Sequence, residues 1–152
     1  GMTRTQPRLG GRRGQSLVEF ALVVPILLLM LVGIIEFGRA WNVSQTVTYA
    51  ARQGSRVAAV LNATGSDPVV ARDSVVAVVT NVLASNNIGT TGCPPGCVDS
   101  INGLMGGQGT PVTVWVGVPY QFMIMGPVMA LNSESFPNGT ITLRSTAVMR
   151  NE

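Results

Sequence analysis

Two residues near the N-terminus, Gly14 and Glu19, have types and spacing that could carry chemistry. Glu19 lies inside an apolar run from Leu17 to Ile35, whose only other departure from apolar residues and glycine is Pro25. A carboxylate at this depth in a bilayer costs about 2.5 to 3.5 kcal/mol, so such groups normally have a partner. Glu19 therefore either meets a cation inside the membrane or lies near the interface, where its side chain reaches water.

The other reactive residue types do not form a recognisable catalytic or metal site. The sequence has no histidine, which is the usual base of hydrolytic triads and the commonest metal ligand. The only two cysteines, Cys93 and Cys97, cannot complete a structural zinc site by themselves. We therefore expect no catalytic residues, no cofactor, no metal and no small-molecule substrate, and we expect that the protein is not an enzyme.

The apolar run has the length needed to cross a hydrocarbon core of about 30 Å. The charged residues that precede it are all arginines: Arg4, Arg8, Arg12 and Arg13. On its other side, Arg39 is offset by Glu36. This asymmetry predicts a single-pass helix with a cytoplasmic N-terminus, so that the rest of the chain is exported.

The net charge of +3 arises in the same N-terminal arm. From Gln15 onward, six arginines stand against seven carboxylates, so the remaining chain is close to −1. Such a chain offers no basic face for a phosphate backbone, and we do not expect nucleic acid as a partner. Cys93 and Cys97 fall in the exported part, where disulfides persist, and we expect an intramolecular disulfide between them.

Small and apolar residues continue beyond the run at spacings of three and four, which is typical of one helical face. They are Ala40, Val43, Val47, Ala50, Gly54, Val57 and Leu61. We expect one long helix that begins near Gln15 or Ser16 and ends near Asn62. The small residues of this face suit close packing against a neighbouring element.

Two charged pairs on this helix are candidate contacts to partner subunits. Glu36 and Arg39 have the i, i+3 spacing of a helical ion pair, which contributes only a few tenths of a kcal/mol when exposed. Arg52 and Arg56 lie one turn apart and would repel each other mildly. The simpler interpretation of Arg52 and Arg56 is a solvated helix face.

The remainder of the chain predicts one more helix and a small sheet. Asp67 and Pro68 are typical of a helix start, and residues 69–83 would form a helix with Val69, Val76, Val79 and Leu83 on its apolar face. The many valines would also suit a strand. A short strand is expected at 98–101, and clear alternation predicts strands at 112–122 and 141–149. The fold class is therefore α+β: a long helix, a shorter helix and a small antiparallel sheet.

A glycine followed five residues later by a glutamate, just ahead of an apolar helix, resembles the type IV prepilin signal. The resemblance implies cleavage after Gly14 by a membrane aspartyl peptidase, so that Gln15 becomes the mature N-terminus. The new α-amino group would then neutralise the Glu19 carboxylate of a neighbouring subunit. The alternatives are an uncut signal anchor and a secretory signal with a small-x-small site at residues 38–40.

Three segments in this order, 14–25, 33–39 and 50–56, are similar to the TadE family of the tight-adherence (Flp/Tad) pilus machinery. The final segment 141–149 is similar to the last strand of those proteins. The similarity is strong over residues 12–60 and only thematic over 62–139. It implies a minor pseudopilin, processed by the prepilin peptidase, whose partners are the lipid bilayer, other pilins and pseudopilins, and the Tad assembly platform.

We accordingly expect a cleaved basic leader at residues 1–14, a transmembrane helix at 15–38 and an extracytoplasmic pilin-like domain at 39–152. The protein would lie in the bacterial inner membrane, from which it could enter a pilus. The alternative is an unprocessed, membrane-anchored module that binds or adheres outside the cytoplasm. The two differ in whether Gln15 becomes the N-terminus.

Overall fold

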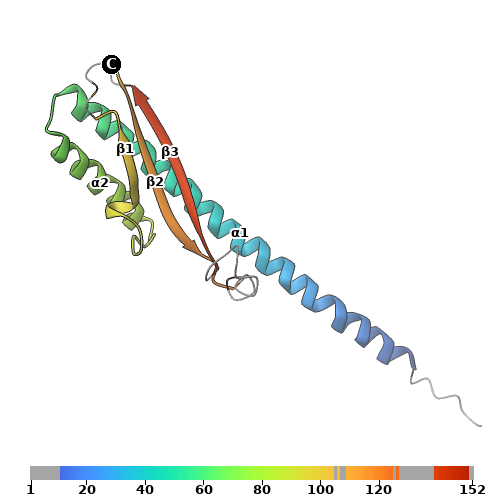
Figure 1. The fold of residues 1–152 in the computed structure, drawn as a ribbon. Helices are drawn as coiled ribbons and strands as arrows, with labels where there is room; N and C mark the ends of the chain where they lie inside the picture. Colours follow the sequence, from blue (N-terminus) through green and yellow to red (C-terminus); the bar gives the residue numbers. More distant parts are fainter. Residues whose placement is uncertain (1–10, 105, 107–108, 125, 127–138, 151–152) are drawn as a thin grey trace, which may run out of the picture. The chain divides into compact units, whose positions relative to one another are not determined.

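The computed structural model describes residues 11–104, 106, 109–124, 126 and 139–150. Most of the basic leader expected at residues 1–14 lies outside this range. In chain order the elements are α1 (Gly11–Ala63), α2 (Pro68–Ser85), the 3-10 turn η1 (Pro95–Cys97), β1 (Val98–Asn102), β2 (Pro111–Gln121) and β3 (Thr140–Arg150) (Figure 1). The predicted α+β fold is thus confirmed. Contacts divide the chain after Ile35 into two compact units.

Helix α1 begins at Gly11, so the start expected near Gln15 is wrong by about one turn. No proline lies between these positions and arginine is a good helix former, so the helix extends toward the leader. Its first turn has no acidic residue to complement the helix dipole. Glycine at positions 11 and 14 costs about 1 kcal/mol each relative to alanine. This first turn is therefore weakly held.

In the first unit, the described side chains of α1 face outward. All of residues 14–35 are exposed except Val24, Val32 and Gly33, which are half-buried. The most apolar stretch of the helix has a mean hydropathy of 2.8, and none of it is buried within the chain. This part of α1 is therefore long and apolar enough to cross a membrane, and it runs through Pro25 as helix.

The sheet of the second unit has the order β1-β2-β3 and is antiparallel throughout. Strand β2 alternates as predicted, with one buried face that consists of Val112, Val114, Val116, Val118 and Tyr120. Pro119 faces Thr142 of β3, whereas the pairing with β1 stops at Val116. Proline, which lacks an amide donor, thus occupies a part of β2 where β1 requires no hydrogen bond.

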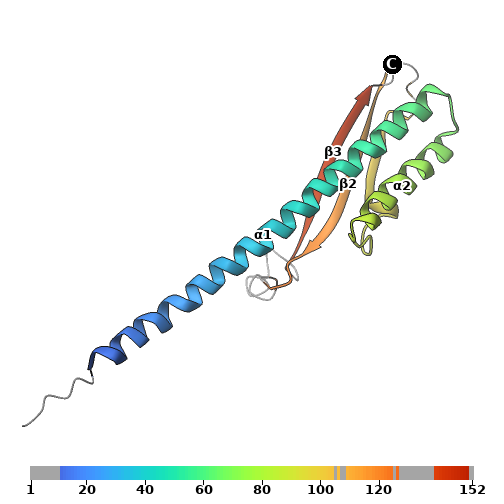
Figure 2. The ribbon, with the colours of Figure 1, turned by 180° about the vertical axis from the view of Figure 1, so that it is seen from behind.

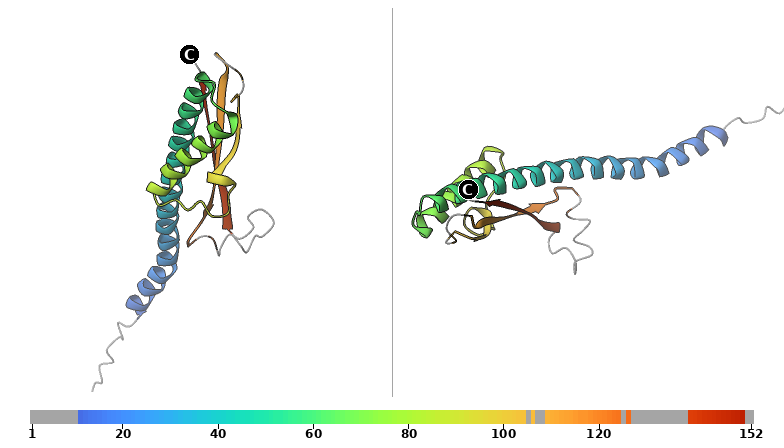
Figure 3. Two further views of the ribbon diagram at one scale, coloured as in Figure 1. Left: turned by 90° about the vertical axis from the view of Figure 1, so that its left-hand side faces the viewer. Right: turned by 90° about the horizontal axis from the view of Figure 1, so that it is seen from above.

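The core of this unit forms where α1, α2 and the buried face of β2 meet. Figures 1 and 2 show the C-terminal stretch of α1 along one face of the sheet, with α2 beside it, and Figure 3 shows both helices on that same side. Helix α1 contributes mainly small residues, namely Val47, Ala50, Ala51 and Ala58, while α2 contributes Val75, Val79 and Leu83. Small side chains on α1 let the two other elements approach its backbone closely.

Residues 69–83 form a helix, as expected, but its predicted apolar face was wrong in part. The buried residues of α2 are Ala71, Val75, Val79 and Leu83, whereas Val69 is 67% exposed. The face is a stripe of residues four apart, and the valines elsewhere on α2 obscured it in the sequence. Helix α2 is also long and apolar enough to cross a membrane, but this stripe is buried in the core.

Gly54 is the point at which α1 touches both of its neighbours. A Cβ atom at this position would lie 2.9 Å from Val79 Cγ2, 3.3 Å from Val75 Cγ1 and 3.5 Å from Val114 Cγ1. The first two atoms belong to α2 and the third to β2. All three are valines, whose short, branched side chains have little freedom to move aside.

We predict that Gly54→Val lowers the free energy of unfolding by about 1 to 3 kcal/mol, because the added methyl groups overpack this junction. Gly38→Val on the same helix is the matched control, since no described atom lies within 4 Å of a Cβ placed there. Near-UV circular dichroism of the detergent-solubilised chain during denaturation measures both. Equal stability of the two variants would contradict the packing described for Gly54.

Candidate functional site

The residues of the expected processing and assembly site lie together on the exposed surface of α1. Gln15 Nε2 donates a hydrogen bond to Glu19 Oε1 at 3.3 Å, one helical turn away. Gly14, Gln15 and Glu19 are all exposed. The Glu19 carboxylate therefore has a polar neighbour of its own chain but no cation within ion-pair distance among the described residues.

Gly14 has no structural role that the described residues explain. Its φ is not in the left-handed region, and no described atom lies within 4 Å of the place that a Cβ would take. Glycine inside a helix is unfavourable relative to alanine by about 1 kcal/mol. A requirement for glycine here must therefore come from something other than the described fold.

Glu36 is the buried carboxylate of the second unit, with only 1% of its surface exposed. The Met123 backbone N–H donates to both carboxylate oxygens, at 3.2 Å and 3.1 Å, and the Ile124 N–H donates to Oε1 at 3.2 Å. Hydrogen bonds to an ionised acceptor are about twice as strong as neutral ones. Glu36 thus holds the chain that leaves β2 against the helix.

The ion pair expected between Glu36 and Arg39 is present in the structure, with Nη1 and Oε1 3.8 Å apart. It is not a simple exposed pair, because the Glu36 side chain is enclosed while that of Arg39 is 47% exposed. Arg39 Nη1 also lies 3.8 Å from Met123 Sδ. The Glu36 carboxylate therefore binds groups of its own chain, and Arg39 is the member of the pair that is exposed.

Tyr120 lies in the electrostatic field of this pair. Burial raises the pKa of the Tyr120 phenol above its ordinary value, the Arg39 charge opposes the rise, and the Glu36 charge adds to it. Its ring packs edge-on against Phe122, with the centroids 5.2 Å apart. Within the described part of the chain, its hydroxyl has no hydrogen-bond partner. The phenol therefore remains neutral and adds an apolar ring to this end of the sheet.

Arg52 and Arg56 lie exposed on α1, one turn apart. The ion pairs among the described residues are Glu36–Arg39 and Asp99–Arg144, so these two arginines have no carboxylate partner there. Both guanidinium groups remain available for other contacts.

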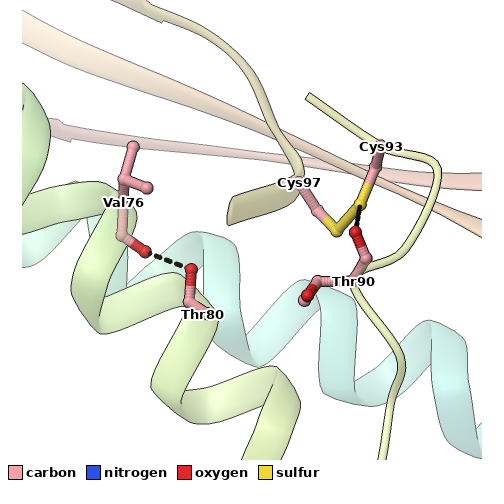
Figure 4. The surroundings of a disulfide bond; sticks show 5 residues. All are labelled: Val76, Thr80, Thr90, Cys93 and Cys97. Atoms are coloured by element: carbon pink, nitrogen blue, oxygen red, sulfur yellow. Dashed lines mark hydrogen bonds between the residues drawn. A yellow bond between two sulfur atoms is a disulfide. The ribbon is translucent and has the colours of Figure 1, made fainter. Parts of the chain in front are cut away.

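Cys93 and Cys97 are joined by a disulfide, as Figure 4 shows, and Cys97 is fully buried. The turn between them packs against α2: a Cβ on Gly96 would lie 2.6 Å from Val76 Cγ1 and 2.7 Å from Thr80 Oγ1. Gly96 also has a φ of 66°, which favours glycine. The disulfide therefore fixes a turn that packs against α2.

The structure brings some of the candidate residues together and leaves others apart. Gly14, Gln15 and Glu19 belong to the first unit, and Glu36 and Arg39 belong to the second. Within the described ranges, no three acidic, cysteine or histidine side chains gather as a metal site would require. The sequence did not reveal the amides of Met123 and Ile124, because backbone donors leave no mark on residue type.

We predict that Glu36→Ala lowers the free energy of unfolding of the second unit by about 2 kcal/mol or more, because it leaves two amides without their acceptor. The control is Asp73→Ala, which removes an exposed carboxylate on α2 and should change stability by less than about 0.5 kcal/mol. Denaturation of the detergent-solubilised chain measures the difference. If Glu36→Ala were as stable as Asp73→Ala, the bonds to Met123 and Ile124 would contribute nothing.

Comparison with known proteins identifies one part of the chain. No curated protein and no solved structure matches it. The family model described as TadE-like protein matches residues 14–56. All candidate residues except the two cysteines fall within that range. The family is a structural and assembly family associated with the Tad pilus. Over residues 14–56 the chain therefore matches the TadE-like proteins, which confirms the resemblance seen in its sequence.

Proposed function

We propose that this protein is a minor pseudopilin that takes part in assembling a Tad type IV-like pilus. In this proposal residues 1–14 are a cytoplasmic leader, 15–38 cross the bacterial inner membrane, and 39–152 form a pilin-like domain outside the cytoplasm. The observation that carries the proposal is the segment 14–35 of α1. It exposes a long apolar surface and contains a single carboxylate, and it lies within the TadE-like match.

Processing after Gly14 is the first step of the proposed function. A peptidase binds its substrate in extended form, so the turn of α1 around the Gly14–Gln15 bond must unwind. This turn has glycine at both 11 and 14 and no acidic residue near its start, so unwinding costs little. An open environment and a weak helical turn both suit the prepilin peptidase as a partner.

The second step is the pairing of the Glu19 carboxylate with the new α-amino group of a neighbouring subunit. Cleavage creates a cation at Gln15, one turn from Glu19 along the same helix face. In a bundle of such helices, the α-amino group of one subunit lies within reach of the carboxylate of the next. Pairing in lipid removes the cost of an isolated membrane carboxylate, about 2.5 to 3.5 kcal/mol, and favours one axial register over others.

The exposed face of α1 beyond the membrane is the surface that we propose for other pilins and the assembly platform. Tyr49 and Val60 are each more than half exposed, and Arg52 and Arg56 lie on the same side of the helix. Aromatic and arginine side chains are enriched in protein interfaces. The two arginines, which lack acidic neighbours among the described residues, suit an acidic partner surface.

We predict that co-expression with the prepilin peptidase removes residues 1–14, so that N-terminal sequencing begins at Gln15. Gly14→Val should block removal, because a branched side chain obstructs the peptidase cleft while the helix tolerates it. Gly33→Val is the matched control, since its Cβ also meets no described atom within 4 Å, and it should be processed normally. Recovery of the intact leader from wild-type cells that make pili would favour an unprocessed, membrane-anchored binding module.

We also predict that Glu19→Gln abolishes incorporation into pili without preventing cleavage, because glutamine keeps the size of the side chain and loses its charge. Quantitative immunoblots of sheared pili and of membranes measure incorporation and cleavage separately. Asp73→Ala serves as the control, since it removes an exposed charge on α2, outside the membrane helix. Normal pili from Glu19→Gln cells would show that this charge does not guide assembly.

A further inference from the structure

Four large apolar side chains are exposed at the end of the second unit that follows the apolar segment. Met123 and Ile124, after β2, are 68% and 51% exposed, and Phe37 and Trp41 on α1 are 68% and 58% exposed. Phe37 and Trp41 stack on each other with their ring centroids 6.2 Å apart. We call these four residues the apolar collar.

The bonds to Glu36 fix where the collar lies. Glu36 directly follows Ile35, the last residue of the apolar segment. Its carboxylate binds the backbone amides of Met123 and Ile124, so their side chains must lie close to the point where α1 would leave the membrane. Phe37 and Trp41 reach the same level, since they follow Glu36 by about one and a half turns of helix at most.

The charges at this level favour lipid over water. The Glu36 carboxylate, which would otherwise oppose approach to a bilayer, is enclosed by two amides and Arg39. Arg39 remains half exposed, and its Nη1 lies 3.8 Å from Met123 Sδ of the collar. Tryptophan is enriched at membrane interfaces, and exposed apolar side chains gain by entering the boundary between head groups and acyl chains.

We propose that the apolar collar inserts into the outer interfacial layer of the bilayer, so that the second unit contacts lipid directly as well as through its helix. The ligand is a lipid surface, and Met123 and Ile124 are the residues of the sheet domain that enter it. This inference rests on the proposed function in one respect: α1 must span the membrane. It adds that the sheet domain is held against the membrane before it joins a filament.

The test uses single cysteines in the full-length, unprocessed chain, in which Cys93 and Cys97 are joined as a disulfide and leave the added thiol free for labelling. Ile124→Cys reports the collar. Val69→Cys is the matched control, because it is an exposed apolar residue on α2 that does not belong to the collar. Leu29→Cys is the reference for the membrane helix. Each variant carries a nitroxide label and is reconstituted at low density in phosphatidylethanolamine and phosphatidylglycerol vesicles.

Paramagnetic resonance then compares collisions with oxygen, which concentrates in lipid, and with a water-soluble nickel chelate. The ratio of oxygen to nickel accessibility should be several-fold higher at Ile124→Cys than at Val69→Cys and highest at Leu29→Cys. Equal ratios at Ile124→Cys and Val69→Cys, with Leu29→Cys in lipid, would overturn the collar alone. The same holds if Ile124→Cys is shielded from both reagents, which indicates a protein contact. A water-exposed Leu29→Cys would overturn both the collar and the proposed membrane helix.

Discussion

Helix α1 has to satisfy two different surroundings along its length, and the rest of the structure follows from that constraint. From Leu17 to Ile35 its side chains are mostly large, apolar and exposed, as a helix in lipid requires. From Val47 to Ala59 the buried positions are mostly alanine, glycine and serine. The large apolar side chains of the first segment are not buried by the rest of the chain. The small residues of the second segment let α2 and β2 pack against the helix backbone.

Glu36 lies at the boundary between the exposed apolar segment of α1 and the part of the helix that belongs to the second unit. A carboxylate cannot be buried without hydrogen bonds, and a chain leaving the end of a strand has amides that need acceptors. Each group supplies what the other lacks, across a separation of 87 residues. Arg39 adds a nearby positive charge. The bonds connect the helix to the chain that follows β2, whereas the small residues of α1 pack with β2 in the apolar core.

The two carboxylates of the TadE-like segment thus have opposite situations. Glu36 is satisfied inside the second unit, by groups that the fold supplies. Glu19 is exposed on α1 and has no cation within ion-pair distance among the described residues, with a neutral Gln15 side chain as its neighbour. A buried and satisfied charge stabilises its own domain. An exposed carboxylate on an apolar surface is open to a partner from another subunit, as the proposed function requires.

Much of this protein was determined by local sequence patterns. The apolar run, the seam of small residues and the alternation in β2 each act through a period that is visible along the chain, so the α+β fold and the strand positions followed from them. The start of α1 at Gly11 does not follow from the sequence pattern, because the residues before Gln15 show no apolar periodicity. The buried face of α2 does not follow from its sequence, because valines occur on several sides of that helix. Packing against α1 and β2 selects the stripe from Ala71 to Leu83. The partners of Glu36 were decided by tertiary structure alone, since backbone amides belong to every residue and only the fold brings two of them to one carboxylate.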